Sequence, residues 1–283
     1  MSQITTKQLV GALAEVKRLP HMPEALLKLN KLLSDPAGVH VDRVAQVIMQ
    51  DVRLTTGLLK AVNSSKYQMG KEITTLPEAI ARLGVNDLRV LALAINYSEA
   101  FQPDPALDQE VFLQHGLLAA HIGSGLAKTA GLKMNPYYGF MIGLMHEVGQ
   151  YMLLQSDLVD YKAVLEASHH KLSALVTLEN KMLGFSHANI GARLLKTWGF
   201  PKDVYMGVLG HHSPHLLETD FQRPAYVGFL AEVGALYVQG RNGLVQSDSE
   251  KINATTLRVL ERFNLTQDTF LTIIDKAQEL VNA

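Results

Sequence analysis

Apolar residues recur at intervals of three and four along almost the whole chain, and this spacing limits the possible fold more than any other feature. Two representative runs are Leu26, Leu29, Leu32, Leu33 and Leu54, Leu58, Leu59, Val62. This is the period of amphipathic helices, whereas strands that are buried on one face alternate apolar and polar residues. We find no convincing strand and no internal repeat of fixed length. The sequence therefore predicts an all-α protein, a bundle of many helices without a significant sheet.

Helix-capping residues support the same prediction. The stretch Thr75-Leu76-Pro77-Glu78 has the pattern of a capping box, in which the hydroxyl and carboxylate bond to free N–H groups of the first turn. Gly84 is expected to end the short helix that begins there. Asp51, Asp157 and Ser186 are expected to be N-caps. The last helix is predicted to run from about Thr266 to the end of the chain.

Two positions suggest how the chain divides. Two prolines stand close together in Gln102-Pro103-Asp104-Pro105, and proline ends a helix because it lacks an N–H donor and restricts the residue before it. A softer boundary lies at 240–248, a stretch that contains Gly, Ser and Asp. We therefore expect an N-terminal helical half at 1–102, a second helical half at 103–240 and a C-terminal helical extension at 241–283.

Composition excludes several classes of function. The chain contains no cysteine, so disulfides, thiolate zinc sites, iron–sulfur clusters and a cysteine nucleophile are ruled out. The formal net charge is −1, which gives no strong attraction to nucleic acid or to an anionic membrane. No window reaches the roughly 18 apolar residues of a membrane span, and the N-terminus has no signal-peptide core. We expect a cytoplasmic protein that binds neither nucleic acid nor membrane.

Histidines are concentrated in one part of the sequence. Nine of the eleven lie between positions 115 and 215, and two groupings stand out, His146-Glu147 and His211-His212. Imidazole is the commonest metal ligand, and with neighbouring carboxylates and no thiols the expected site has nitrogen and oxygen donors. Adjacent residues on a regular helix point about 100° apart, so His211 and His212 could reach one centre only through long side chains or at a helix end.

Several longer stretches of the sequence stand out as motifs. They are LPHMP at 19–23, VIMQDVRLTTGLLKAVNSSKY at 47–67, ITTLPEAIARLG at 73–84, GLMHEVGQYML at 143–153, GFSHANIGARLLKTWGFP at 184–201, and His211-His212. In this order they resemble the HDOD domain, an output domain related to the HD superfamily of metal-dependent phosphohydrolases, and the resemblance covers roughly residues 15–235. The resemblance implies an all-helical, HD-like bundle. Many such domains have lost the catalytic site and act as signalling or interaction modules.

The resemblance also implies a set of ligands, one or two divalent ions such as iron, manganese, zinc or nickel, and a bridging role for Glu147. The four ligands implied for a first ion are His115, His146, Glu147 and Glu232. The four implied for a second ion are Glu147, His187, His211 and His212. His187 follows Ser186 in the first turn of its helix, where the helix dipole disfavours an imidazolium, so we expect a neutral ring there.

The sequence departs from the family pattern at two of the implied ligands, at one neighbouring position and in one motif. Glu147 and Glu232 stand where HD proteins have aspartate, and the extra methylene displaces each carboxylate by about 1.5 Å, one C–C bond. Gln150 stands where many HD enzymes have a lysine, so a cation that could bind substrate phosphate is missing. The Gly-Tyr-Pro motif of cyclic-di-GMP phosphodiesterases is absent after His211-His212.

Alternatives remain at several positions. Taken alone, His115 or His187 is better explained as a buried, hydrogen-bonded core residue, and Glu232 as a solvated or capping acid. His121, His169, His170 and His215 have no motif support and are expected at the surface or in packing. Asn63-Ser64-Ser65 is expected to have a structural role, because polar residues after a helix usually cap it and satisfy backbone groups. Two functions stay open: a signalling output module with a retained metal site, which has a protein partner, or a metal-dependent phosphohydrolase that acts on a nucleotide or other phosphoester. Whether the protein is an enzyme is not decided by the sequence.

Overall fold

The computed structural model describes residues 24–33, 38–64, 70–100, 106–156, 159–168, 172–242 and 252–282. Contacts divide the chain into two compact units, with a boundary between Gln102 and Pro103. We call residues 20–102 the N-terminal unit and residues 103–283 the C-terminal unit. The described residues form helices and no strand, which confirms the predicted all-α fold. None of the described helices is both long enough and apolar enough to cross a lipid bilayer.

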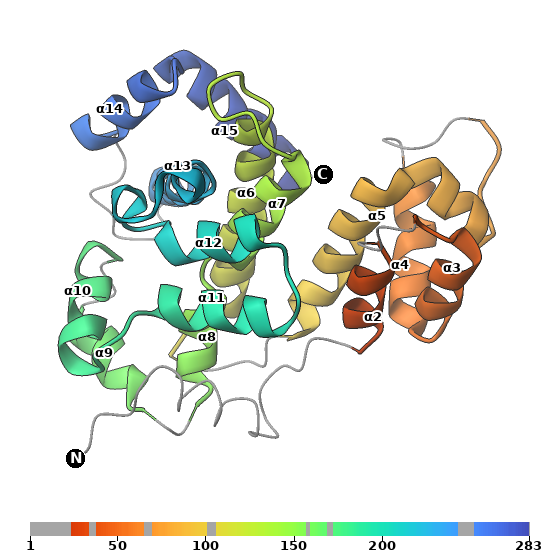
Figure 1. Ribbon diagram of the computed structural model, residues 1–283, viewed down its shortest axis with the longest axis horizontal. Coiled ribbons are helices and arrows are strands. Elements are labelled where there is room, and N and C mark those ends of the chain that lie inside the picture. Colours follow the sequence, from red (N-terminus) through yellow and green to blue (C-terminus); the bar gives the residue numbers. More distant parts are fainter. Residues whose placement is uncertain are drawn as a thin grey trace. The chain divides into compact units, whose positions relative to one another are not determined.

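The described residues of the N-terminal unit form four helices that pack on one another (Figure 1). They are α2 (Glu24–Leu33), α3 (Val41–Met49), α4 (Val52–Val62) and α5 (Leu76–Ala100). The predicted N-cap Asp51 accepts hydrogen bonds from the backbone N–H groups of Arg53 and Leu54. Gly84 has φ 70° and ψ 171°, so the first helical segment of α5 ends there as predicted and a second one follows after a kink.

Asn63 ends α4 and ties it to a following segment. Its amide nitrogen donates to the carbonyl oxygens of Leu59 and Ile73, and its amide oxygen accepts from the N–H of Ile73. Both halves of the side-chain amide are therefore used on the backbone. This arrangement gives Asn63 the structural role that the sequence predicts.

In the part of the C-terminal unit that the structure describes, there are ten α-helices and a short 3-10 helix (Figure 1). They are α6 (Gln109–Ala127), α7 (Pro136–Met145), α8 (Val148–Leu154), α9 (Tyr161–Ala167), α10 (Leu172–Met182), α11 (His187–Thr197), α12 (Lys202–Gly210), η1 (Pro214–Leu216), α13 (Thr219–Arg241), α14 (Ala254–Arg262) and α15 (Gln267–Asn282). The N-cap of α11 is Ser186, as predicted. Asp157 lies outside the described residues, and α9 is capped by Asp160.

Helix α13 is the centre of this unit, because it contacts α6, α7, α12 and α15 (Figure 1). The last helices share its core: Leu260 of α14 and Ile274 of α15 are buried in one cluster with Ile122 of α6 and Leu230 of α13. Residues after 252 thus complete the core on one side of α6 and α13. On their other side these two helices face the histidine-bearing segments.

Close helix contacts bring those segments together. A Cβ atom at Gly143 of α7 would lie 2.1 Å from the carbonyl oxygen of Ala119 on α6. One at Gly149 of α8 would lie 2.0 Å from the carbonyl oxygen of His187 on α11. Real Cβ atoms do not approach so closely, so only glycine allows these backbones to meet. Both glycines lie within three residues of His146-Glu147 and bring other helices to that pair.

Candidate metal centre

The predicted ligands come from five separate places in the C-terminal unit. His115 lies within α6, and His146-Glu147 forms the junction between α7 and α8. His187 is the first residue of α11, and Glu232 lies within α13. His211 and His212 follow the last residue of α12, so the pair lies at a helix end. This position gives both rings access to one centre, which a regular helix would not.

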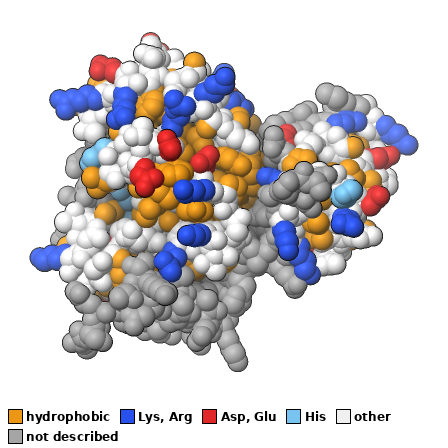
Figure 2. All heavy atoms as spheres, in the orientation of Figure 1, with side chains coloured by type: hydrophobic (Ala, Val, Ile, Leu, Met, Phe, Trp, Pro, Cys, Tyr) orange, Lys and Arg blue, Asp and Glu red, His pale blue; other side chains and the backbone are white. Residues whose placement is uncertain are grey.

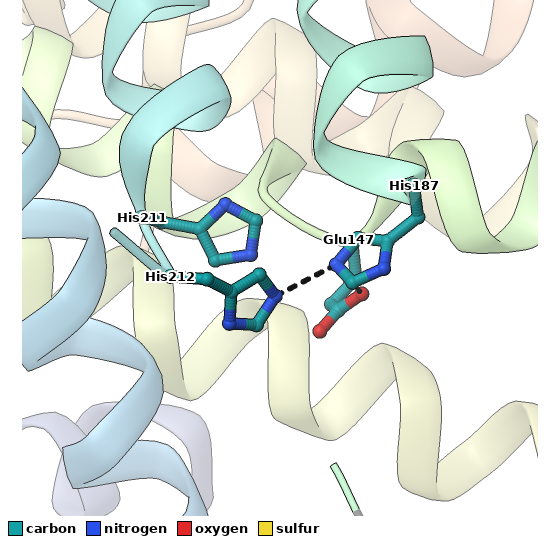
Figure 3. Close-up of side chains that lie close together, drawn as sticks. All are labelled: Glu147, His187, His211 and His212. Carbon is teal, nitrogen blue, oxygen red and sulfur yellow. Dashed lines mark hydrogen bonds and ion pairs between the residues drawn. The ribbon is translucent and has the colours of Figure 1, made fainter. Parts of the chain in front are cut away.

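Six of the seven residues form two groups of donors that share Glu147. The first, here the three-ligand cluster, consists of His115, His146 and Glu147; the second, the four-ligand cluster, consists of Glu147, His187, His211 and His212. Within each group the donor atoms lie within 4.8 Å of one another. Figure 3 shows the four-ligand cluster, with the histidine rings and the Glu147 carboxylate gathered around a common centre.

Glu232 is placed differently from what the family pattern implies. Its Oε2 atom lies 3.4 Å from Nδ1 of His212, and it is not part of the three-ligand cluster. The carboxylate therefore borders the four-ligand cluster instead of joining His115 and His146. Burial and, secondarily, the Glu147 carboxylate raise the pKa of Glu232 well above its ordinary value.

Each of the four most deeply placed histidines uses its Nδ1 atom on a fixed acceptor. Nδ1 of His146 donates to the carbonyl oxygen of Gly143 over 2.7 Å, and Nδ1 of His211 donates to that of Val208 over 2.6 Å. The other two acceptors are Gln239 Oε1, 2.9 Å from His115 Nδ1, and the Glu179 carboxylate, 2.8 and 2.9 Å from His187 Nδ1. Metal-binding histidines are oriented by partners of this kind on the ring nitrogen that does not bind the metal.

The opposite nitrogen of each ring points into the centre. Nε2 of His115 lies 3.0 Å from Nε2 of His146, and Nε2 of His187 lies 2.9 Å from Nε2 of His212. In the His115–His146 pair both neutral rings donate through Nδ1, so each Nε2 carries only a lone pair, and two lone pairs repel at this distance. Two nitrogens that are each about 2.1 Å from one ion and at right angles lie about 3.0 Å apart. The separations therefore suit a shared cation.

Glu147 provides a second test of whether the donor atoms of the two clusters fit a metal ion. The side chain is buried, and neither carboxylate oxygen accepts a hydrogen bond from the described residues. Its Oε2 atom lies 3.3 Å from Nε2 of His187 and its Oε1 atom 4.0 Å from Nε2 of His146. The buried Nε2 of His211 also has no hydrogen-bond partner. Buried polar atoms without partners are costly, and here they lie where a divalent ion would bind. The donor set fits a metal ion.

The charges of the histidines divide into two groups. Burial lowers the pKa of His115, His146, His211 and His212, so these rings are neutral near pH 7. Burial acts in the same direction on His187, but the carboxylates of Glu147 and Glu179 outweigh it and raise the pKa to about 9. The expectation of a neutral His187 at the helix N-terminus is therefore wrong for the metal-free protein, because two adjacent carboxylates act more strongly than the helix dipole.

Three supporting residues escaped the sequence analysis: Tyr161, Glu179 and Gln239. Glu179 is fully buried, as is the hydroxyl-bearing Tyr161 that donates to it. Gln239 connects α13 to α6 by accepting from His115 and donating to the carbonyl oxygen of Val111 over 3.0 Å. A signal for Glu179 does exist, because it lies four residues after the buried Leu175 on the apolar face of α10. A charged residue in an apolar stripe indicates a specific buried partner.

The histidines without motif support lie elsewhere. The His121 ring stands edge-on to Phe140, with 5.4 Å between the ring centroids, and His215 is exposed. His169 and His170 are outside the described residues. None of the four belongs to either cluster of donors found in the described part of the chain.

Comparison with known proteins identifies the family. The HDOD domain model matches residues 19–214, and the chain belongs to this family. An uncharacterized protein of Treponema pallidum is 27% identical over 224 residues, which are 76% of this chain but 42% of that protein. The chain thus spans less than half of the length of this relative.

Solved structures share the fold. A proposed phosphohydrolase from Shewanella amazonensis superimposes with a TM-score of 0.75 and 22% identity, over 99% of this chain and 95% of that one. An HDOD domain protein of unknown function from Geobacter sulfurreducens superimposes with a TM-score of 0.70 and 22% identity. The match covers 98% of this chain and 97% of that one. A proposed signal transduction protein from Marinobacter aquaeolei superimposes with a TM-score of 0.72 and 20% identity. The match covers 100% of this chain and 61% of that one. At these identities the likeness establishes the fold alone.

Proposed function

We propose that this protein is an HDOD signalling output module whose C-terminal unit holds two divalent metal ions, one in each cluster, with Glu147 as the shared ligand. The observation that carries the proposal is the Glu147 carboxylate, which is buried between the two clusters without a hydrogen bond from the described residues. Imidazole and carboxylate donors suit iron, manganese, zinc or nickel. With Nδ1 held by a fixed acceptor in His115, His146, His187 and His211, the Nε2 atom of each of these rings is already oriented towards the centre.

The position of Gln150 favours signalling over hydrolysis. Where many HD enzymes have a lysine, this buried glutamine forms a hydrogen bond with the hydroxyl of Tyr161. It provides no positive charge for a substrate phosphate. We therefore expect the ions to stabilise the folded C-terminal unit, and a protein of a signalling pathway to be the partner.

The surface gives little support for a nucleic-acid partner. On the described part of the face drawn in Figure 2, Lys and Arg side chains are dispersed among acidic and hydrophobic ones and form no continuous basic band. The formal net charge of −1 agrees with this distribution. Proteins that bind nucleic acid use a concentrated basic surface to neutralise phosphates.

A metal-dependent phosphohydrolase is the second candidate, and one observation favours it. The side chain of His212 is 17% exposed, more than the other histidines of the two clusters, and Glu232 lies beside it. The four-ligand cluster is thus nearest to solvent at His212. Two divalent ions held close together activate water and stabilise negative charge on phosphoryl oxygens. A nucleotide or other phosphoester would approach on this side.

One experiment separates these functions. The untagged protein is purified without added metal, and its metal content is measured by elemental mass spectrometry beside that of His146→Ala. We expect about two equivalents per chain in the wild type and fewer in the variant. The metal-loaded proteins are then incubated with bis(p-nitrophenyl) phosphate and with nucleotides. Hydrolysis above the His146→Ala background would establish the second candidate, and equal metal content in the two proteins would disprove the ligand assignment.

A further inference from the structure

A hydrogen-bonded chain of three side chains leads to His187 from outside the metal centre. The hydroxyl of Tyr161 on α9 donates to Oε1 of Glu179 on α10 over 2.5 Å. The Gln150 side chain on α8 bonds to the same hydroxyl. Glu179 in turn accepts from Nδ1 of His187 and, through Oε2 at 3.1 Å, from the backbone N–H of His187. Three helices thus supply the side chains of this hydrogen-bonded chain, and Glu179 is the member that contacts the ring of His187 at the start of α11.

Glu179 is an unusual residue to find at this depth. It is 0% exposed, and a buried carboxylate is strongly disfavoured unless charged or hydrogen-bonding groups surround it. Among the described residues, the donors to its carboxylate belong to Tyr161 and His187. Its position is therefore explained by His187, which it holds by both the ring and the backbone.

The three-ligand cluster has no comparable support. His115 is held by the neutral amide of Gln239, and His146 by the backbone carbonyl of Gly143. A carboxylate behind a metal-binding imidazole fixes the ring orientation and raises its basicity more than a neutral acceptor does. The four-ligand cluster also has one donor more than its neighbour. Both differences favour tighter metal binding at the four-ligand cluster.

We propose that Gln150, Tyr161 and Glu179 are positioning residues for His187, and that they make the four-ligand cluster the tighter of two metal subsites. This inference rests on the proposed function, because it requires that both clusters bind an ion. It assigns a role to Gln150: the residue that replaces the lysine of HD enzymes supports a metal ligand from outside the cluster.

Titration of the metal-stripped full-length protein with Zn²⁺, in competition with a chromogenic chelator, tests the proposal. The wild type should show two classes of site. Glu179→Gln keeps the size of the side chain but removes its charge. At about pH 9.5, above the pKa of about 9 that His187 has despite its burial because of Glu147 and Glu179, a proton no longer competes for the ring. Under this condition the tighter class should weaken by about 10- to 100-fold, the range seen when outer-shell partners are lost. The looser class should keep its affinity. Tyr161→Phe should produce a smaller loss at the same class.

Two further variants make the assignment specific. Tyr226→Phe removes another buried hydroxyl, one that accepts from Arg262 instead of supporting a ligand, and both affinities should equal those of the wild type. His115→Gln should remove the looser class alone. If Glu179→Gln does not fold, as judged by circular dichroism, Tyr161→Phe decides the question.

The outcomes distinguish this inference from the proposed function. A wild type that binds no Zn²⁺ overturns both. Two classes of site in the wild type, with affinities unchanged in Glu179→Gln or in a folded Tyr161→Phe, overturn only the role of the three positioning residues. Loss confined to the looser class, or loss of the tighter class in His115→Gln, reverses the order of affinity and overturns the proposal as well. A selective loss of the tighter class supports it.

Discussion

The Nε2 atoms of His115 and His146 face each other at 3.0 Å, although the two residues are 31 positions apart in the sequence. Each ring is held in this orientation from behind, His115 by Gln239 and His146 by the carbonyl oxygen of Gly143. Burial lowers the pKa of both histidines, with further lowering of the His146 pKa by the His115 charge. Two neutral rings with opposed lone pairs form an arrangement that a cation bound between them would stabilise.

Replacing the shared ligand should affect both clusters. Glu147→Gln removes the charge but not the bulk, and we expect metal content to fall from about two equivalents to less than one. His115→Gln, which changes only the three-ligand cluster, should retain about one equivalent. Elemental analysis of the two variants after the same purification checks this. Equal metal content in the two would show that Glu147 is not shared.

Metal binding should release a proton near neutral pH. In the metal-free protein the pKa of His187 is raised to about 9 by Glu147 and Glu179 despite burial, so the ring is an imidazolium at pH 7, and a ligand must be neutral. Apparent affinity should therefore rise by about tenfold per pH unit towards pH 9 and then level off. Calorimetric titration in buffers of different ionisation enthalpy measures the proton count, and a count of zero at pH 7.5 would contradict the prediction.

The same pKa shift has a consequence for stability without metal. A folded-state pKa above the unfolded value of about 6.5 means that charged His187 stabilises the fold below pH 6.5. This contribution is lost as pH rises from 6.5 through about 9. In thermal unfolding of the metal-stripped protein, Tm should fall as pH rises across this range. The Tm of His187→Gln should fall less over the same range.

Glu232→Gln should have opposite effects on the metal-free and metal-loaded protein. Burial and then Glu147 raise the pKa of Glu232 well above its usual value, so its ionisation costs stability at pH above the ordinary carboxyl pKa. The amide removes that cost, and the metal-free Tm at pH 7 should increase. Added metal should then raise Tm less than in the wild type. Glu261→Gln, at an exposed position on α14, serves as the control and should change neither value.

Gly149→Ala should damage the packing of α8 on α11. The added Cβ would lie 2.0 Å from the carbonyl oxygen of His187, and forced overpacking typically costs about 1–3 kcal/mol. At Gly191 the closest atom would be Cγ1 of Val148 at 3.2 Å, so Gly191→Ala should be milder. Urea unfolding of the metal-free variants gives both free energies, and an equal loss in the two would refute the role assigned to Gly149.

Asn63→Ala tests the N-terminal unit. The change leaves the N–H of Ile73 without its acceptor, and a buried backbone group without a partner costs about 1–3 kcal/mol. Ser64→Ala, next to it at an exposed position, should change stability by no more than about 0.5 kcal/mol. Urea unfolding measures both losses. Zn²⁺ affinity should be unchanged in both variants because all of the candidate ligands lie in the C-terminal unit.

The sequence could predict the helical fold and the family, because both depend on patterns that neighbouring residues carry. Helix periodicity and the N-caps at Asp51 and Ser186 are local. The candidate ligands were also found from the order of motifs, and the structure brings six of the seven into two clusters. Glu232 is the exception, because the place of a residue in a family motif does not tell where a side chain that is one methylene longer puts its carboxylate.

The sequence by itself determined which elements form and which side chains are candidates for binding a metal. Tertiary structure decided which nitrogen of each ring points inward. It also brought Glu179 to His187 and placed Gln150 in hydrogen-bonding contact with Tyr161. It also decided the charge of His187, which follows from two carboxylates on different elements. The physical reason is that electrostatics and hydrogen bonding act over a few ångströms in space, between residues that only the close approach of helices makes neighbours.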